Sequence, residues 1–296
     1  MPEAGKSRPR IACEVALDRV VAARAGEHGS LLDVYSTRTL SAGAVAPGLA
    51  SGNVVRSDEL RLAISDVLAA VGGRTRDLIA VVPDAAVRVM LLDFDTLPEN
   101  QQEASSIVRF RLRKSLPFDI DQAALSYQAR RSNGAVRVVA AVAPRAVIQE
   151  YESAFHDAGY APGVVLPSML ATLGIVTSEK PTMVVKIDGV TITVAIVDGD
   201  ELRLFRTLEN PAGTRVTGAQ IAAEIYPSVV FFEDTFGARI EGILVGGTSA
   251  ADIAPALREQ ANARVQDLPG ARYLSGTLTS DVPGWSLAAV AGALLG

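Results

Sequence analysis

The same order of expected secondary-structure elements occurs twice along this chain of 296 residues. In each occurrence the apolar pattern predicts three strands joined by short turns, then a helix and another strand. The first set lies at 10–16, 19–26, 31–40, 58–71 and 78–82, and the second at 183–188, 190–197, 201–208, 217–236 and 240–246. A helix at 248–261, a strand at 264–267 and a helix at 285–295 follow the second set. The repetition predicts an α/β protein with two related lobes and a cleft between them.

A segment with a different order of elements separates the two sets. We expect strands at 86–92, 123–130, 135–142 and 161–166, and helices at 99–115 and 145–158. Ser132-Asn133-Gly134 predicts a tight hairpin turn. We therefore predict an inserted α+β subdomain over 83–176 that returns to the first lobe. The first lobe spans 10–82, the second spans 177–296, and residues 1–9 are expected to form a disordered tail.

The helix expected at 58–71 also has recognisable ends. Its apolar residues recur at helical spacing, and Ser57 is expected to act as its N-cap because a serine oxygen accepts hydrogen bonds from first-turn amides. Gly72-Gly73 is expected to end it.

Composition excludes several classes of function. Apolar residues make up 49% of the chain, but no run approaches the ~20 residues that span a bilayer, and the N-terminus lacks the apolar core of a signal peptide. We therefore expect a cytoplasmic protein without a membrane span. A net charge of −5 gives no reason to expect nucleic-acid binding. His28 and His156 have no metal-like spacing, and no metal site is expected.

Two short segments have the features of a phosphate-binding cleft. One is a strand, turn and strand around Lys186-Ile187-Asp188-Gly189, and the other is a buried strand that opens through Gly246-Gly247-Thr248 into a helix. Glycines allow a phosphate to approach the backbone because they carry no Cβ, and carboxylates hold the water shell of a metal ion.

Residues 78–128 contain a series of short motifs in a fixed order: Ala80-Val81-Val82-Pro83, Val87-Arg88-Val89-Met90, Leu97-Pro98, Lys114-Ser115-Leu116-Pro117-Phe118-Asp119-Ile120-Asp121 and Leu125-Ser126-Tyr127. Through these motifs the segment resembles the PilM family, actin-like proteins of type IV pilus assembly. It implies an actin-like (ribonuclease H-like) two-lobe fold with an inserted α+β subdomain. The family is related to FtsA and to the cytoplasmic domain of the type II secretion protein GspL.

The chain departs from the family pattern in its cleft. Ala16 replaces a glycine of the first phosphate loop, and Lys186 and Asp188 replace the Asp and Gly of the second. Only about 30 residues separate the third strand of the second lobe from the next strand, which leaves room for one helix and predicts a reduced second lobe. The resemblance therefore implies a degenerate nucleotide site, formed by Glu14, Ala16, Lys186, Asp188, Gly189, Gly246, Gly247 and Thr248, with no cofactor and no catalytic residue.

Two features of this cleft have alternative interpretations. Glu14 and Lys186 either form an ion pair across the cleft in place of the metal, or are each half exposed with separate neighbours. Gly246-Gly247 either contacts a nucleotide or only turns the strand into the helix, with Thr248 as N-cap.

The resemblance implies a non-catalytic scaffold at the inner membrane, in a type IV pilus or related type II secretion machine. Such proteins bind the N-terminal cytoplasmic tail of PilN, a bitopic membrane protein, and couple it to the motor ATPase. We expect the tail in a groove near 82–89 and 107–118, at Val87, Val89, Ile107, Phe110, Arg111 and Phe118. The alternative is an active actin-like ATPase or ATP-switched filament, with Glu14 holding magnesium and Gly246-Gly247 the ATP.

A basic run lies on the expected helix of the subdomain, at Arg109, Arg111, Arg113 and Lys114. It is either a solvated helix face, partly neutralised by Asp119 and Asp121, or a landing surface for an acidic partner or the anionic inner leaflet.

Overall fold

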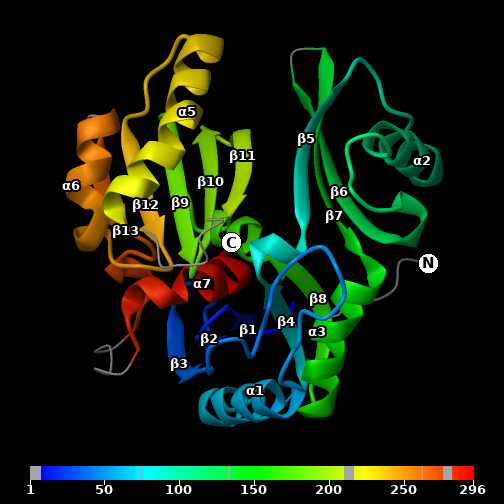
Figure 1. Cartoon of the computed structure of the whole chain (residues 1–296), viewed down its shortest axis with the longest axis vertical. Helices are drawn as coiled ribbons and strands as arrows, with labels where there is room; N and C mark the ends of the chain where they lie inside the picture. Colours follow the sequence, from blue (N-terminus) through cyan, green and yellow to red (C-terminus); the bar gives the residue numbers. More distant parts are fainter. Residues whose placement is uncertain (1–7, 74, 133, 210–216, 262, 276–281) are drawn as a thin grey trace.

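The computed structural model describes residues 8–73, 75–132, 134–209, 217–261, 263–275 and 282–296. Residues 1–7 of the expected tail and Asn133 of the expected hairpin turn lie outside the described residues. The described chain forms two five-stranded sheets, one three-stranded sheet and the helices that cover them (Figure 1).

The first five-stranded sheet has the order β3-β2-β1-β4-β8. Its strands are β1 (Ile11–Val15), β2 (Arg19–Ala25), β3 (Leu32–Thr39), β4 (Asp77–Val82) and β8 (Ala161–Pro167). The first three form an antiparallel meander, and β4 and β8 add to it in parallel. Helices α1 (Ser57–Val71) and α3 (Arg145–Asp157) bury their apolar residues against one face.

The second five-stranded sheet repeats this arrangement, with the order β11-β10-β9-β12-β13. Its strands are β9 (Thr182–Asp188), β10 (Thr191–Asp198), β11 (Glu201–Glu209), β12 (Gly242–Gly246) and β13 (Arg264–Asp267). Helices α5 (Gly218–Phe236) and α6 (Ala250–Ala261) cover its outer face. The expected duplication is confirmed. The described residues between β11 and β12 form one helix, α5, as the short connection predicts.

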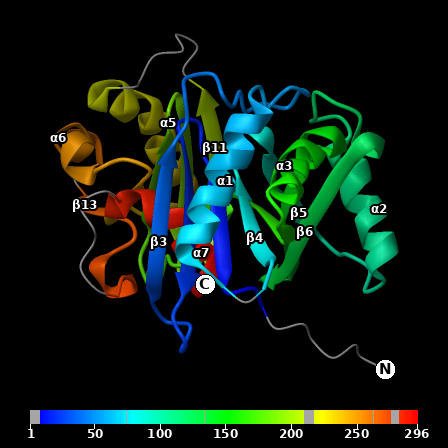
Figure 2. The same cartoon turned by 90° about the horizontal axis from the view of Figure 1, so that it is seen from below.

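The third sheet has the order β5-β7-β6 and carries one helix. Its strands are β5 (Arg88–Phe94), β6 (Ala123–Ser132) and β7 (Ala135–Pro144), and α2 (Gln101–Leu112) packs on the face turned away from the second lobe (Figures 1 and 2). Short 3₁₀ turns lie at Asp84–Ala86, Ile120–Gln122, Ala271–Tyr273 and Gly284–Leu287.

Several expected helix starts differ from the structure. Helix α1 has Arg56, not Ser57, as its N-cap, because Leu60 N–H already donates to the Arg56 carbonyl (3.0 Å). Asn100 caps α2 by accepting from Gln102 and Glu103 N–H. The last expected helix divides into a 3₁₀ turn and α7 (Ala288–Leu295).

Helix α7 lies between the two five-stranded sheets (Figure 1). It packs in one cluster with Ala12 and Val21 of the first sheet and Val184 and Ala195 of the second, together with residues of α4 (Ser168–Leu173). The helices approach closely at Gly292, where an added Cβ would lie 1.9 Å from the Ala171 carbonyl oxygen.

We predict that Gly292→Ala lowers the free energy of unfolding by about 1–3 kcal/mol, because the new methyl group forces α4 and α7 apart. This loss opposes the gain of about 1 kcal/mol that Ala normally brings inside a helix. Urea denaturation followed by circular dichroism measures it. The matched variant Gly48→Ala, which places its methyl group in open space, is expected to change stability by less than about 0.5 kcal/mol. Equal stability of the two variants would contradict the close packing.

Candidate functional site: the cleft between the two lobes

Turns from both lobes meet at one end of the two sheets. The β1–β2 turn at 16–18 and the β9–β10 turn at 189–190 lie beside the β12–α6 junction at 246–249 and the N-terminus of α5. Together with Trp285 they line a cavity of about 520 Å³. The sequence-predicted cleft residues are therefore brought to one region.

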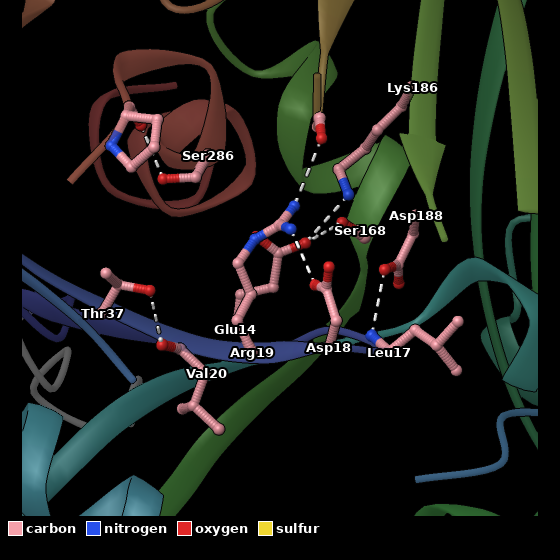
Figure 3. Close-up of polar contacts among 12 residues, drawn as sticks. Glu14, Leu17, Asp18, Arg19, Val20, Thr37, Ser168, Lys186, Asp188 and Ser286 are labelled. Carbon is pink, nitrogen blue, oxygen red and sulfur yellow. Dashed lines mark hydrogen bonds and ion pairs between the residues drawn. The ribbon is translucent and has the colours of Figure 1, made fainter. Parts of the chain in front are cut away.

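Lys186 and Glu14 form a buried ion pair between the lobes (Figure 3). The Lys186 Nζ atom lies 2.9 Å from Glu14 Oε1, and the two side chains are only 3% and 4% exposed. Glu14 belongs to β1 and Lys186 to β9, so the contact joins the two sheets. The Ser168 hydroxyl of α4 donates to the same Glu14 oxygen. The ion-pair interpretation is confirmed, and the half-exposed alternative is wrong.

Two further carboxylates surround this pair. Asp84 accepts a hydrogen bond from Met169 N–H (2.8 Å), and Asp188 accepts one from Leu17 N–H (2.9 Å). Burial raises the pKa of Asp84 to about 6, against the opposing charge of Lys186. Burial likewise raises the pKa of Asp188, again opposed by Lys186. Burial lowers the pKa of Lys186, but the charges of Glu14, Asp188 and Asp84 outweigh it, so the net shift is upward and the ammonium stays charged.

The two loops that would hold phosphates touch each other. Besides the hydrogen bond from Leu17 to Asp188, the Leu17 side chain packs on Gly189, where an added Cβ would lie 2.1 Å from Leu17 Cδ2. Gly189 has φ +60°, a backbone conformation that favours glycine. Ala16 is buried, and its N–H donates to the Arg19 carbonyl (2.9 Å) to close the β1–β2 turn.

The glycine pair after β12 is approached by protein rather than by open space. A Cβ on Gly247, at φ +78°, would lie 1.9 Å from the Ile187 carbonyl oxygen, and one on Gly246 would lie 3.1 Å from Ala288 Cβ. This packing explains why both positions are occupied by glycine. Thr248 is buried but is not the N-cap, because α6 begins two residues later at Ala250, whose N–H donates to the Asp267 carboxylate (2.6 Å).

Arg19 is a cleft residue that sequence reasoning missed. Its guanidinium pairs with Asp18 (2.7 Å; Figure 3) and donates to the Gly247 carbonyl (3.3 Å). It also lies 5.0 Å from the centre of the Trp285 ring. Its Nε atom is buried without a hydrogen-bond partner in the described part of the chain. The side chain thus extends from β2 across the cleft toward the glycine pair. An arginine at the start of a strand is ordinarily predicted to be solvent-exposed, so the sequence contained no signal for a role of Arg19 in the cleft.

The residues expected to bind a partner do not form one groove. Val87 and Val89 belong to the core of the first lobe, and Phe118 packs into the cluster under α2. Ile107, Phe110 and Arg111 lie on the exposed side of α2.

A second cavity, of about 750 Å³, lies between the third sheet and both lobes. Its walls come from β6, β7, β8, α4 and the β10–β11 hairpin, and half-buried apolar side chains line it: Val139, Val165, Leu166, Leu170, Leu173, Val176, Val197 and Leu202. Arg130 pairs with Asp200 at its rim, and Arg137 pairs with Asp93 and Glu201. We call this cavity the subdomain groove. It contains none of the six expected partner-binding residues.

Among the residues that the structure describes, no three His, Cys, Asp or Glu side chains are grouped so as to hold a metal ion. None of the helices that the structure describes is long and apolar enough to cross a membrane.

Removal of one partner of the buried ion pair is predicted to be strongly destabilising. Lys186→Met leaves the Glu14 carboxylate buried without its counter-charge, which costs about 3–5 kcal/mol. Glu14→Gln/Lys186→Met removes both charges, and we expect it to regain most of the lost stability. Urea denaturation at pH 7.5 compares the two variants with the parent. A single variant as stable as the parent would contradict the buried pair.

Asp84 is predicted to make stability depend on pH. Because its pKa is about 6 when folded, against an ordinary value of 3.8, the folded state binds a proton that the unfolded state releases between these values. The stabilisation that the folded state gains from a proton on Asp84 is therefore lost above pH 6 and grows as the pH falls toward 4. At about 1.4 kcal/mol per pKa unit, Asp84→Asn should exceed the parent in stability by about 2–3 kcal/mol at pH 7.5.

The advantage of Asp84→Asn should vanish near pH 4, and its amide oxygen keeps an acceptor for Met169 N–H. Unfolding free energies of both proteins, measured from pH 4 to 7.5, provide the test. A variant less stable than the parent at pH 7.5, or a difference independent of pH, would overturn the assignment.

Comparison with known proteins identifies the fold. No family model matches the sequence, and no curated protein matches it. Among solved structures, one described as a PilM-PilN type IV pilus biogenesis complex matches over 97% of this chain and 98% of its own, with a TM-score of 0.79 and 16% identity.

Two further solved structures have the same fold. A Bacteroides thetaiotaomicron protein with an actin-like ATPase fold matches over 95% of this chain and 93% of its own (TM-score 0.56, 7% identity). The cytoplasmic domain of EpsL, an inner membrane component of the type II secretion system of Vibrio cholerae, matches over 79% and 80% (TM-score 0.51, 7% identity). The chain therefore has the actin-like fold that the PilM resemblance implied.

Proposed function

We propose that this protein is a non-catalytic cytoplasmic scaffold of a type IV pilus or type II secretion platform, which binds the cytoplasmic tail of a PilN-like membrane protein. The observation that carries the proposal is the match over almost the whole length of both chains to a structure of a PilM-PilN complex. The match to a cytoplasmic domain from a type II secretion system supports the same class of machine. Coupling to a motor ATPase and location at the inner membrane belong to this proposal.

The residues of the interlobe cleft do not fit a bound nucleotide with its metal. Leu17 packs directly on Gly189, so a side chain covers the Gly189 backbone that a phosphate would approach, although the two turns still line the cavity of about 520 Å³. Lys186 neutralises Glu14, so this carboxylate is not free to hold a metal ion. Arg19 extends toward Gly247, and the glycine backbone is already approached by Ile187. These contacts support a scaffold that needs no ATP, rather than the ATPase alternative.

The subdomain groove is the proposed site for the tail. Its volume of about 750 Å³ lies within the range typical of ligand pockets, and its walls are mainly apolar with charged pairs at the rim. Under this proposal the partner site lies on the side of the third sheet that faces β10 and β11. The expected location at Ile107 and Phe110 lies on the other side, on α2.

Strand β6 gives the groove a backbone partner for an extended peptide. It is ten residues long and lies at the edge of its sheet, where β7 is the one strand of the described chain that pairs with it. It contains no proline or lysine that would block edge pairing. An added strand could therefore continue the ladder, a common mode of peptide recognition.

The two faces of β6 lead into different cavities. From the register, Ser126, Gln128 and Arg130 face the subdomain groove, whereas Leu125, Tyr127 and Ala129 face α2. On the α2 side a cavity of about 580 Å³ is lined by these residues with Leu97, Ala104 and Ser105. A strand added at this edge would place alternate side chains in the two cavities, which specifies an apolar, extended peptide.

Melting temperatures test the proposal. The probes are 5 mM ATP with magnesium and a synthetic peptide that copies the N-terminal cytoplasmic tail of a PilN-like protein from the same genome. At a hundredfold excess over its dissociation constant a ligand stabilises by about 2.7 kcal/mol, which produces a readily measured shift. We expect a shift with the peptide and none with ATP. A shift with ATP alone would overturn the scaffold assignment.

Variants locate the site within the same experiment. Val139→Trp places an indole on the groove floor, and we expect it to abolish the peptide-induced shift. Val55→Trp adds the same side chain at an exposed position before α1 and should keep the shift. Methylation of alternate backbone amides of the peptide tests strand addition, because one alternate set should abolish binding and the other should not. Equal effects of the two sets would contradict pairing with β6.

A further inference from the structure

The structure separates the basic run of α2 into bound and unbound charges. Arg109 donates to the Ile120 carbonyl oxygen (2.8 Å), which fixes the turn after α2. Arg113 pairs with both oxygens of Asp121 (3.1 and 3.0 Å), while Asp119 caps the following turn. Within the described residues, Arg111 and Lys114 have no ion pair and are exposed. The expected neutralisation therefore covers only part of the run.

The two unbound cations lie beside an exposed apolar pair. Phe110 is 77% exposed, more than any other large apolar residue that the structure describes, and Ile107 is 38% exposed. Positions 107, 110, 111 and 114 fall at spacings of three, four and seven, which places them on one side of the helix and its final turn. We call Ile107, Phe110, Arg111 and Lys114 the α2 outer face. It points away from both lobes (Figure 1).

We propose that the α2 outer face docks on an anionic membrane surface, with Phe110 entering the headgroup region between Arg111 and Lys114. An aromatic ring flanked by flexible cations is the pattern of interfacial membrane contacts. The charge of the chain supports this orientation. Its net charge is −5, so an anionic bilayer repels the molecule as a whole and attracts it at such a cationic face.

The strength of this contact fits an auxiliary role. Each basic residue near an anionic surface contributes on the order of fivefold to partitioning, so two cations and one ring give only weak binding. A tether raises the effective concentration and makes such a contact effective. In this respect the inference rests on the proposed function, since a membrane protein's tail paired with β6 would hold the α2 side of the same sheet near the bilayer. The contact with lipid itself does not depend on the tail.

The test uses the full chain without any tail peptide, in about 50 mM salt, with vesicles of phosphatidylcholine alone or mixed equally with phosphatidylglycerol. Phe110→Ser/Arg111→Ser is compared with the matched control Leu62→Ser/Arg61→Ser, which removes an exposed leucine and an arginine from α1. We expect binding only to the mixed vesicles, at least fivefold weaker in the first variant and unchanged in the control. The indole emission of a Phe110→Trp variant should shift to the blue on mixed vesicles.

Three results would overturn the proposal: no binding to mixed vesicles at 1 mM lipid, equal loss in the two double variants, or no change in the emission of the Phe110→Trp variant on binding. The first result would leave an acidic protein as the remaining partner for this face. Tail-peptide binding is measured separately on the same variants, because Phe110 and Arg111 do not line the subdomain groove. Loss of lipid binding with intact peptide binding therefore separates this inference from the proposed function.

Discussion

The buried pair of Glu14 and Lys186 is a polar contact that joins the two lobes beside the apolar cluster around α7. Each charge is unfavourable in the interior unless the other is present, so the pair holds β1 and β9 at a fixed separation. Asp84, Asp188 and Ser168 complete a polar network around it, and Leu17 packs on Gly189 where the two turns meet. In this account, protein groups take over the task that a shared ligand would perform between two such lobes.

A fixed pair of lobes gives the third sheet a stable place to attach. The sheet is held to the β10–β11 hairpin by Arg130 and Arg137, and the subdomain groove forms where the three units meet. Its width is thus set by the same contacts that close the cleft. The free edge of β6 lies along this groove, and α2 covers the opposite face of the sheet. Peptide recognition and membrane contact are therefore assigned to two faces of one small unit.

Much of the fold could be predicted from the sequence, because turn residues and apolar patterns are local signals. The duplicated meander and the inserted sheet followed from such patterns or from the family resemblance, whereas the Glu14–Lys186 pair was one of two alternatives that the sequence left open. The subdomain groove did not follow from these patterns, since its walls come from five elements that meet only in the folded chain. The place of Arg19 and the hydrogen bond from Arg109 to the Ile120 carbonyl depend on tertiary neighbours too, whereas the pairing of Arg113 with Asp121 agrees with the expected partial neutralisation. The predictions of Ser57 and Thr248 as N-caps were wrong, because α1 begins one residue earlier than a Ser57 cap requires and α6 begins two residues after Thr248.

A crystal structure obtained with 5 mM ATP and magnesium would test the central claim most directly. The account predicts that Lys186 Nζ remains within hydrogen-bond distance of Glu14, that Leu17 stays packed on Gly189, and that no nucleotide density appears between the two turns. Density for phosphates between these turns, with Lys186 moved away from Glu14 onto the phosphates, would contradict it.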